Sequence, residues 1–352
     1  MGAFDNCAAN AAALELARVI HLHQKDLARS VRIAWWPGHS NGRYMGSTWY
    51  CDKYFRDLRR RCVACLNSDL IGARGADVLA VRTSGAEGAA FTEALKELGA
   101  PGAKIRYLPI GRGADQSFFG ADIPYHINPR FETGDRQYDT PGAGGDYWHT
   151  AEDTYDKIDL GVLEKDARVL GLLTFAMAAE PQLPCDPDGY FRRQAGALRD
   201  MEGWAGADFD LSEVRDLYER TWEAVKAALE WTGESGSGEA MVTRGAEAVE
   251  AKRAEAGNAG NADARNTLIK KAFGTLNRLY QTSGSPYEQD TAFAYGPFHL
   301  LGESCSVKKD TTPADQYLFY RTTFVRQRNR MLTELEYLIQ YLEKGGKYER
   351  TD

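Results

Sequence analysis

Short apolar segments alternate with helical segments through the first third of the chain. A helix is predicted after residues 5–6, where apolar side chains recur at helical spacing. The later segments, apolar strands with helices between them, lie at residues 31–36, 48–61, 63–66, 78–81, 89–98 and 105–108. This alternation predicts an α/β fold, with a mainly parallel, mixed sheet covered by helices on both faces. Ligands of such sheets bind beyond the carboxyl ends of strands, so residues that directly follow a strand are site candidates.

From about residue 160 the pattern becomes helical. Helices are predicted at 163–179, 211–231 and 240–256, with glycine-rich breaks on both sides of the last of these. A final helix ends at Gly345-Gly346, and its apolar stripe comprises Val325, Leu332, Leu335, Ile339 and Leu342. That stripe could pack within the chain or pair with a second subunit. We therefore expect an α/β domain at 1–200 and a helical domain at 201–352.

Charge and hydropathy exclude several classes of protein. A net charge of −7 argues against nucleic acid or an anionic membrane as the main partner. The apolar run at 170–178 is about half the ~18–20 residues that a membrane span needs, and reads as a buried helix. No secretory signal pattern opens the chain, and the six cysteines lack the spacing of a disulfide framework, so a cytoplasmic location is expected. Cys62 and Cys65 form a C-x-x-C that runs into a strand, which favours buried small side chains over a redox or zinc role.

Three positions carry metal-binding chemistry. His149 lies in an acidic, aromatic loop, Tyr147-Trp148-His149-Thr150-Ala151-Glu152-Asp153-Thr154, whose carboxylates and hydroxyls are placed to hold a ligating ring. Asp69 directly follows a predicted strand, and Asp5 precedes the first helix. Carboxylate oxygen and imidazole nitrogen suit a divalent ion, and two ions can share a carboxylate. Taken singly, Asp5 could cap a helix, Asp69 could be an ordinary strand-end residue, and His149 could be a surface histidine.

Together these segments resemble the co-catalytic zinc aminopeptidase and glutamate carboxypeptidase family, which includes the transferrin receptor as a non-enzymatic relative. Gly-Ala-Phe-Asp-Asn at 2–6 matches the family segment whose aspartate bridges two zinc ions, which implies that role for Asp5. Asn-Ser-Asp-Leu-Ile-Gly at 67–72 matches the strand end that supplies a terminal ligand, here Asp69. The Trp-His-Thr-x-x-Asp-Thr loop supplies the last histidine, here His149. The resemblance covers roughly 1–185, with a weaker echo of the helical dimerisation domain around 276–280.

The resemblance also implies a substrate side of the site. Asp115 lies in a segment similar to the family's substrate-side loop, with Gln116 in place of a histidine. Tyr147 and Trp148 would border the pocket, and Arg112 or Arg130 would bind a substrate carboxylate.

Two departures from the family pattern bear on the chemistry. The family's Glu-Glu pair, a general base followed by a metal ligand, is replaced by His39-Ser40. An imidazole can act as a base or a ligand, whereas a hydroxyl is a poor substitute for a zinc-bound carboxylate; the alternative for His39 is a loop histidine bonded to backbone. Residues 38–42 also match the letters Gly-x-Ser-x-Gly, but the next helix is predicted only near Thr48, which argues against Ser40 as a nucleophile.

The second departure concerns the family's first histidine ligand, which lies on a strand upstream of the bridging aspartate. Met1 lies only four residues before Asp5, so two alternatives are open: the chain is a truncated product, or a partner chain supplies the strand and the histidine. We expect the partner chain, because an unpaired central strand would leave backbone groups exposed. The expected function is a metal-dependent hydrolase that cleaves an amide or peptide-like C–N bond. We expect zinc, with iron or manganese as alternatives, as one or two ions, and a small-molecule or peptide-like substrate, within a homo- or hetero-oligomer. The alternative is a non-catalytic peptidase-like scaffold or binding subunit.

Overall fold

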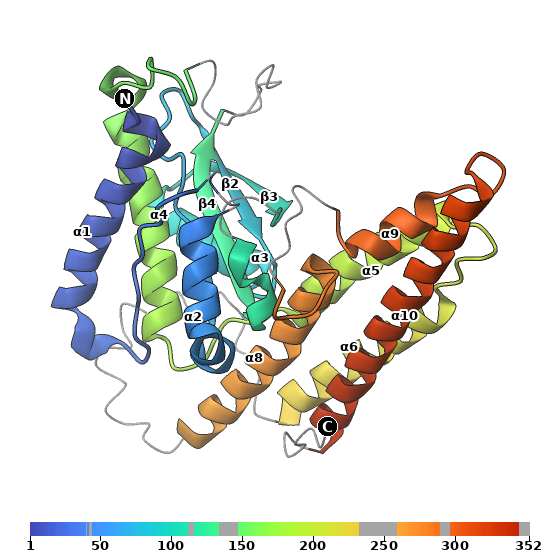
Figure 1. Cartoon of the computed structure of the whole chain (residues 1–352). Coiled ribbons are helices and arrows are strands. Elements are labelled where there is room, and N and C mark those ends of the chain that lie inside the picture. Colours follow the sequence, from blue (N-terminus) through green and yellow to red (C-terminus); the bar gives the residue numbers. More distant parts are fainter. Residues whose placement is uncertain are drawn as a thin grey trace.

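A four-stranded sheet forms the centre of the N-terminal half of the protein (Figure 1). The computed structural model describes residues 1–39, 41, 44–111, 116–133, 147–231, 259–288 and 296–344. The strands, in the lateral order β1-β4-β2-β3, are β1 (Ala64–Leu66), β4 (Tyr125–Glu132), β2 (Val78–Thr83) and β3 (Lys104–Pro109). β1 runs parallel to β4 and β2 parallel to β3, whereas β2 and β4 are antiparallel. The predicted α/β fold with a mainly parallel, mixed sheet is therefore confirmed.

β4 is the strand that the sequence analysis did not predict. Its apolar residues Tyr125, Ile127 and Phe131 alternate with polar residues, which is the period of a strand. Pro129 lies in its middle, opposite Val81 of β2, and proline is uncommon in a central strand. Both neighbours of β4 are strands, and seven of its eight residues are buried.

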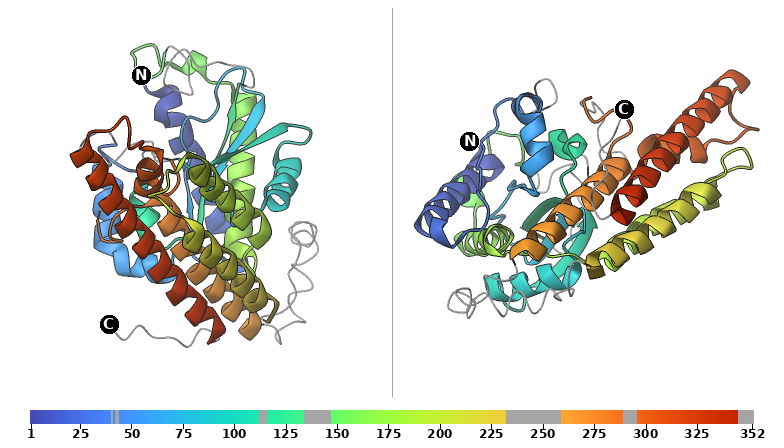
Figure 2. Two further views of the ribbon diagram at one scale, coloured as in Figure 1. Left: turned by 90° about the vertical axis from the view of Figure 1, so that its right-hand side faces the viewer. Right: turned by 90° about the horizontal axis from the view of Figure 1, so that it is seen from below.

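Helices cover both faces of the sheet (Figure 2). On one face lie α3 (Ala89–Gly99) and α4 (Leu160–Ala179), with α1 (Ala8–Leu22) packed against α4. The other face is covered by α2 (Met45–Arg61) and α8 (Ala259–Gln281).

α8 contacts the segment that precedes β4 through its backbone, an amide group and charged side chains, among them Arg278, whose Nε lies 2.6 Å from Asp122 Oδ1. A Cβ on Gly274 would lie 2.1 Å from the carbonyl oxygen of Asp122. The Asn277 amide donates to the carbonyl oxygens of Ile123 and Pro124, at 3.1 and 2.6 Å. α8 is thereby fixed to the segment that leads into β4.

The C-terminal half is helical, with α5 (Pro187–Trp204), α6 (Ser212–Trp231), α9 (His299–Ser306) and α10 (Ala314–Glu343). α10 packs against α6 and α9. Of its predicted stripe, Leu335, Ile339 and Leu342 are buried, but Val325 is 46% exposed, so most of the stripe packs within the chain. The predicted domain boundary at residue 200 falls inside α5. The predicted helix at 240–256 and the stop at Gly345-Gly346 lie outside the described residues.

The predicted strand at 31–36 is wrong, because this segment pairs with none of the described strands. Its side chains are anchored to α2 instead: Arg32 Nη2 lies 2.6 Å from Asp57 Oδ2, and the Trp36 ring lies 5.2 Å from the Tyr50 ring. Trp35 stays 46% exposed.

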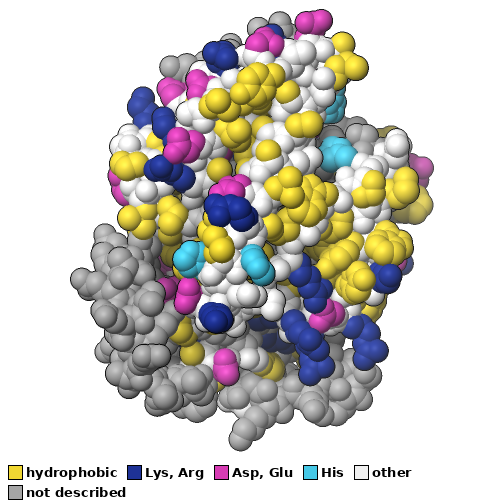
Figure 3. Space-filling model, turned by 90° about the vertical axis from the view of Figure 1, so that its left-hand side faces the viewer, with side chains coloured by type: hydrophobic (Ala, Val, Ile, Leu, Met, Phe, Trp, Pro, Cys, Tyr) yellow, Lys and Arg dark blue, Asp and Glu magenta, His cyan; other side chains and the backbone are white. Residues whose placement is uncertain are grey.

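On the face that carries α1, hydrophobic side chains reach the surface in several patches (Figure 3). No helix in the described ranges is both long and apolar enough to cross a bilayer.

Candidate metal centre

Asp5 lies in a kinked turn that precedes α1. The π-type turn Ala3–Cys7 contains two residues with non-helical backbone angles, Asp5 (φ −114°, ψ 92°) and Asn6. The fully buried Phe4 side chain anchors this turn in the hydrophobic core. No side chain caps α1, so Asp5 does not act as the helix cap that its sequence position also allowed.

The loop that carries His149 meets this turn at the top of Figure 1. His149 has a left-handed backbone (φ 59°), and its ring stacks on Trp148 with the ring centroids 3.6 Å apart. Its Nε2 atom lies 3.0 Å from Asp5 Oδ2. The imidazole is 51% exposed and the carboxylate 23%, so the pair is open to solvent on one side. Two of the three predicted ligands are therefore adjacent.

Asp153 has a different position from the one expected of it. The sequence predicted that carboxylates after His149 would hold its ring, but Asp153 directs both of its oxygens at backbone N–H groups. Oδ1 accepts from Phe4 at 2.8 Å and Oδ2 accepts from Asp5 at 2.9 Å. The Thr150 hydroxyl closes the loop itself, by donating to the Tyr147 carbonyl at 2.7 Å.

Asp69 follows β1, and burial and the charge of Asp5 both act on the pKa of its carboxyl. Burial raises the pKa of its carboxyl, and the Asp5 carboxylate raises it further, whereas Arg130 and His39 act in the opposite direction. The structure therefore places Asp5 and His39 each within electrostatic range of Asp69.

The loop after Asp69 is held by a buried carboxylate on α4. Asp166 accepts hydrogen bonds from the backbone N–H of Gly72 at 2.8 Å and of Phe131 at 2.7 Å. Burial raises the pKa of Asp166 to about 7. This residue ties the Asp69 loop to β4 and was not identified from the sequence, because a polar residue at one helical position gives no sign of which backbone it reaches.

His39 lies in an exposed turn just before α2. Its carbonyl accepts from the N–H of Tyr44 at 3.0 Å, and its ring meets the Tyr44 ring edge-on, with the centroids 5.4 Å apart. A nucleophile elbow requires a helix that starts directly after its serine. Here α2 begins only at Met45. Ser40 itself lies outside the described residues.

Arg130 belongs to a cluster of three guanidinium groups around Glu132. Arg82, Arg106 and Arg130 each lie 2.7–2.8 Å from its carboxylate, which is 1% exposed. Burial alone would raise the pKa of Glu132, but the charges and hydrogen bonds of Arg82 and Arg130 lower it. This cluster lies beside Asp69, whose carbonyl lies 3.5 Å from Arg130 Nη1.

Arg82 and Arg106 were missed from the sequence, because they reach Glu132 only through the lateral order of β2, β3 and β4. Tyr147 and Trp148 are half-buried, and they directly precede His149 of the Asp5–His149 pair. The other two predicted substrate residues, Arg112 and Asp115, lie outside the described residues.

The donor set fits a divalent metal in kind. Ligand atoms held about 2.0 Å from a tetrahedral ion are separated by about 3.3 Å, close to the 3.0 Å between Asp5 Oδ2 and His149 Nε2. Two buried oxygens beside these ligands, Asn6 Oδ1 and Ser68 Oγ, have no hydrogen-bond partner within the described residues. Among all the residues that the structure describes, no three His, Cys, Asp or Glu side chains form a ready-made metal-binding group. Within the described residues, the Asp5–His149 pair therefore supplies two donor atoms that lie close enough to share one ion.

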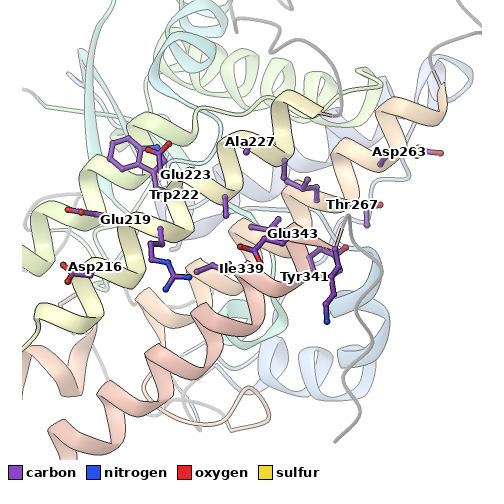
Figure 4. A pocket seen from close by; sticks show the side chains of 17 residues that line it. Asp216, Glu219, Trp222, Glu223, Ala227, Asp263, Thr267, Ile339, Tyr341 and Glu343 are labelled. Atoms are coloured by element: carbon purple, nitrogen blue, oxygen red, sulfur yellow. The ribbon is translucent and has the colours of Figure 1, made fainter.

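A groove of about 1460 Å³ lies elsewhere, between α6, α8 and α10 (Figure 4). Its lining combines carboxylates, among them Glu219, Asp263 and Glu343, with apolar side chains such as Ile339. None of the predicted site residues lines it, so it is separate from the candidate metal centre.

Comparison with known proteins gives one family and a set of similar structures. Residues 1–174 match the model of peptidase family M28. An aminopeptidase from Aneurinibacillus sp. strain AM-1 is 24% identical, with 54% of this chain and 43% of that chain covered and a TM-score of 0.43. BSAP, a zinc aminopeptidase from Bacillus subtilis, is 21% identical, with 50% and 42% covered and a TM-score of 0.39. The chain thus spans less than half of the length of either structure, and no curated protein matches it.

Proposed function

We propose that the protein is a metal-dependent hydrolase that cleaves an amide or peptide-like C–N bond. The premise is that residues 1–174 of this chain belong to peptidase family M28. The observation that carries the proposal is the 3.0 Å approach of His149 Nε2 to Asp5 Oδ2. Asp69 supports it, because its pKa responds to the charges of both Asp5 and His39.

Each residue of the centre has a role in this proposal. Asp5, Asp69 and His149 hold one or two divalent ions, zinc in the first place and iron or manganese as alternatives. A bound divalent ion polarises the substrate carbonyl and lowers the pKa of a coordinated water. His39, on its exposed turn, takes the proton from the attacking water or serves as a further ligand. The substrate is a small molecule or a peptide-like chain.

The substrate-binding roles follow from position and charge. Tyr147 and Trp148 precede His149 and border the pocket, with the Trp148 ring stacked on the imidazole. Arg130 is tied to Glu132 through Nε, and its Nη1 points toward the Asp69 backbone. The guanidinium group of Arg130 favours a substrate that carries a carboxylate.

A peptidase-like scaffold or binding subunit is the second candidate. The lack of a ready-made group of three ligands within the described residues favours it, as does the serine in place of a family glutamate. In either case we propose that the chain works within an oligomer, in which a partner can supply a further ligand.

Metal content of the full chain distinguishes the two candidates. Wild type and His149→Ala are equilibrated with zinc, desalted and measured by elemental analysis, and then assayed with a series of amino-acid p-nitroanilides. His23→Ala is the matched control, because His23 is similarly exposed and also faces an aspartate, Asp26, at 3.3 Å. We expect wild type and the control to retain zinc and to hydrolyse at least one anilide, and His149→Ala to lose both properties. Absence of retained zinc from wild type would instead favour the scaffold.

A further inference from the structure

We infer that Asp153 is a positioning residue for the metal centre, one that sets the place of Asp5 relative to His149. The inference rests on the proposed function, because it assigns to Asp153 an effect on metal affinity. It concerns a residue that touches neither metal nor substrate and acts through the backbone of Asp5.

The hydrogen bonds of Asp153 converge on one short stretch of backbone. Its carboxylate accepts from the N–H groups of Phe4 and Asp5, and its carbonyl accepts from the N–H of Ala3 at 3.3 Å. Three consecutive N–H groups of the N-terminal turn are therefore bonded to a single residue. Asp153 is 2% exposed, so these bonds are shielded from water.

The same residue is part of the turn that presents His149. The N–H of Asp153 donates to the Thr150 carbonyl at 3.4 Å, within the loop that His149 enters with its left-handed backbone. Asp153 thus links the backbone of Asp5, through its side chain, to the loop of His149, through its own backbone. The Phe4 ring, edge-on to Tyr147 with the centroids 5.8 Å apart, holds the same two segments together from the core side.

The arrangement requires a carboxylate rather than any polar side chain. Both oxygens of an ionised carboxylate accept hydrogen bonds, whereas asparagine offers one acceptor and two donors. In Asp153→Asn, an amide N–H would face a backbone N–H, and one of the two bonds would be lost. Asp5 would then be free to move away from His149, and the two side chains would no longer be held together before a metal ion binds.

Zinc affinity of the full chain, measured by competition with a chromophoric chelator, tests the inference. We expect Asp153→Asn to bind zinc about 10–100-fold more weakly than wild type, as is typical when an outer-shell partner is removed. Asp159→Asn is the matched control, because Asp159 also accepts two backbone N–H bonds, from Gly161 and Val162, at the start of α4. The control should bind zinc like wild type.

Two further measurements separate positioning from a general loss of stability. In metal-free protein, the amides of Phe4 and Asp5 should exchange hydrogen faster in Asp153→Asn, and not in Asp159→Asn. With cobalt in place of zinc, the visible spectrum should change in Asp153→Asn alone, because the ligand geometry differs. If Asp153→Asn does not fold, Asp153→Glu, which keeps both oxygens but moves them by one methylene, is measured in its place.

The outcomes also separate this inference from the proposed function. If wild type binds zinc and Asp153→Asn binds it equally well with an unchanged cobalt spectrum, the inference is wrong and the proposed function stands. If wild type itself binds no zinc, the proposed function fails, and the role of Asp153 at a metal centre fails with it.

Discussion

His149 Nε2 lies 3.0 Å from Asp5 Oδ2, so two predicted ligands that are far apart in the sequence lie side by side. Replacing Asp5 with asparagine would keep the size of the side chain but remove its negative charge. Neutral amides are weaker ligands for divalent ions than carboxylates are. We expect Asp5→Asn to reduce zinc affinity by more than the about 10–100-fold that follows loss of an outer-shell partner.

The check is a zinc titration of the full-length variant beside Asp26→Asn. Asp26 faces His23 on the surface in the same kind of pair, and its replacement should leave zinc affinity unchanged. Equal zinc affinity in Asp5→Asn and wild type would exclude Asp5 as a ligand.

Much of the sheet and of its helices could be predicted from local patterns. The segments that became β1, β2, β3, α2 and α3 were identified from short apolar runs and from helical spacing, although only β2 of these three strands is largely buried. The segment at 31–36 has the composition of a strand but no partner among the described strands, and pairing cannot be read from composition. β4 had the opposite problem: its alternation is clear, but Pro129 argues against a central strand.

The site could be predicted only in part, for a related reason. Asp5, Asp69 and His149 were recognised because each lies in a family-like motif. Asp153, Asp166 and the Arg82–Arg106–Glu132 contacts depend on which backbone or strand lies opposite, and that is a property of the tertiary fold. His39 was placed at the position of the family's base, and the structure puts it in electrostatic range of Asp69, while its role stays a prediction.

The Asp166 carboxyl should make stability depend on pH. Its folded-state pKa is raised to about 7 from 3.8, so between about pH 4 and pH 7 the native state holds a proton that the unfolded chain has released. The associated stability is therefore complete below pH 4 and is lost as the pH rises through 7. We expect the unfolding free energy of wild type, relative to Asp166→Asn, to fall by on the order of a few kcal/mol across this window. Urea unfolding at pH 5 and pH 7.5 measures it, and parallel pH dependences would refute the assignment.

His126 should have the opposite effect. Burial chiefly, with Lys270 as a second cause, lowers the pKa of its imidazole to about 3 from 6.5, so the folded protein keeps the ring neutral while the unfolded chain takes up a proton. The corresponding stability is present above pH 6.5 and is lost as the pH falls toward 3. Because the ring packs against Phe119, His126→Phe should fold and should lower the pH midpoint of acid unfolding, as followed by circular dichroism. The exposed His23→Phe is the control, and an equal shift in both variants would contradict the prediction.

Gly274 should be required for the contact between α8 and the segment that leads into β4. An added Cβ would lie 2.1 Å from the Asp122 carbonyl oxygen, and backbone on both sides leaves no flexible group to move aside. We expect Gly274→Ala to lower the unfolding free energy by about 1–3 kcal/mol, the usual cost of overpacking, despite the helix propensity gained. Gly196→Ala in α5 is the matched control: its Cβ would have only Arg199 Nη2 nearby, at 4.0 Å, so the same substitution should stabilise the helix by about 0.5–1 kcal/mol. Opposite signs for the two variants in urea unfolding would verify that α8 packs on the segment leading into β4, whereas stabilisation by both would show that α8 does not approach Asp122 this closely.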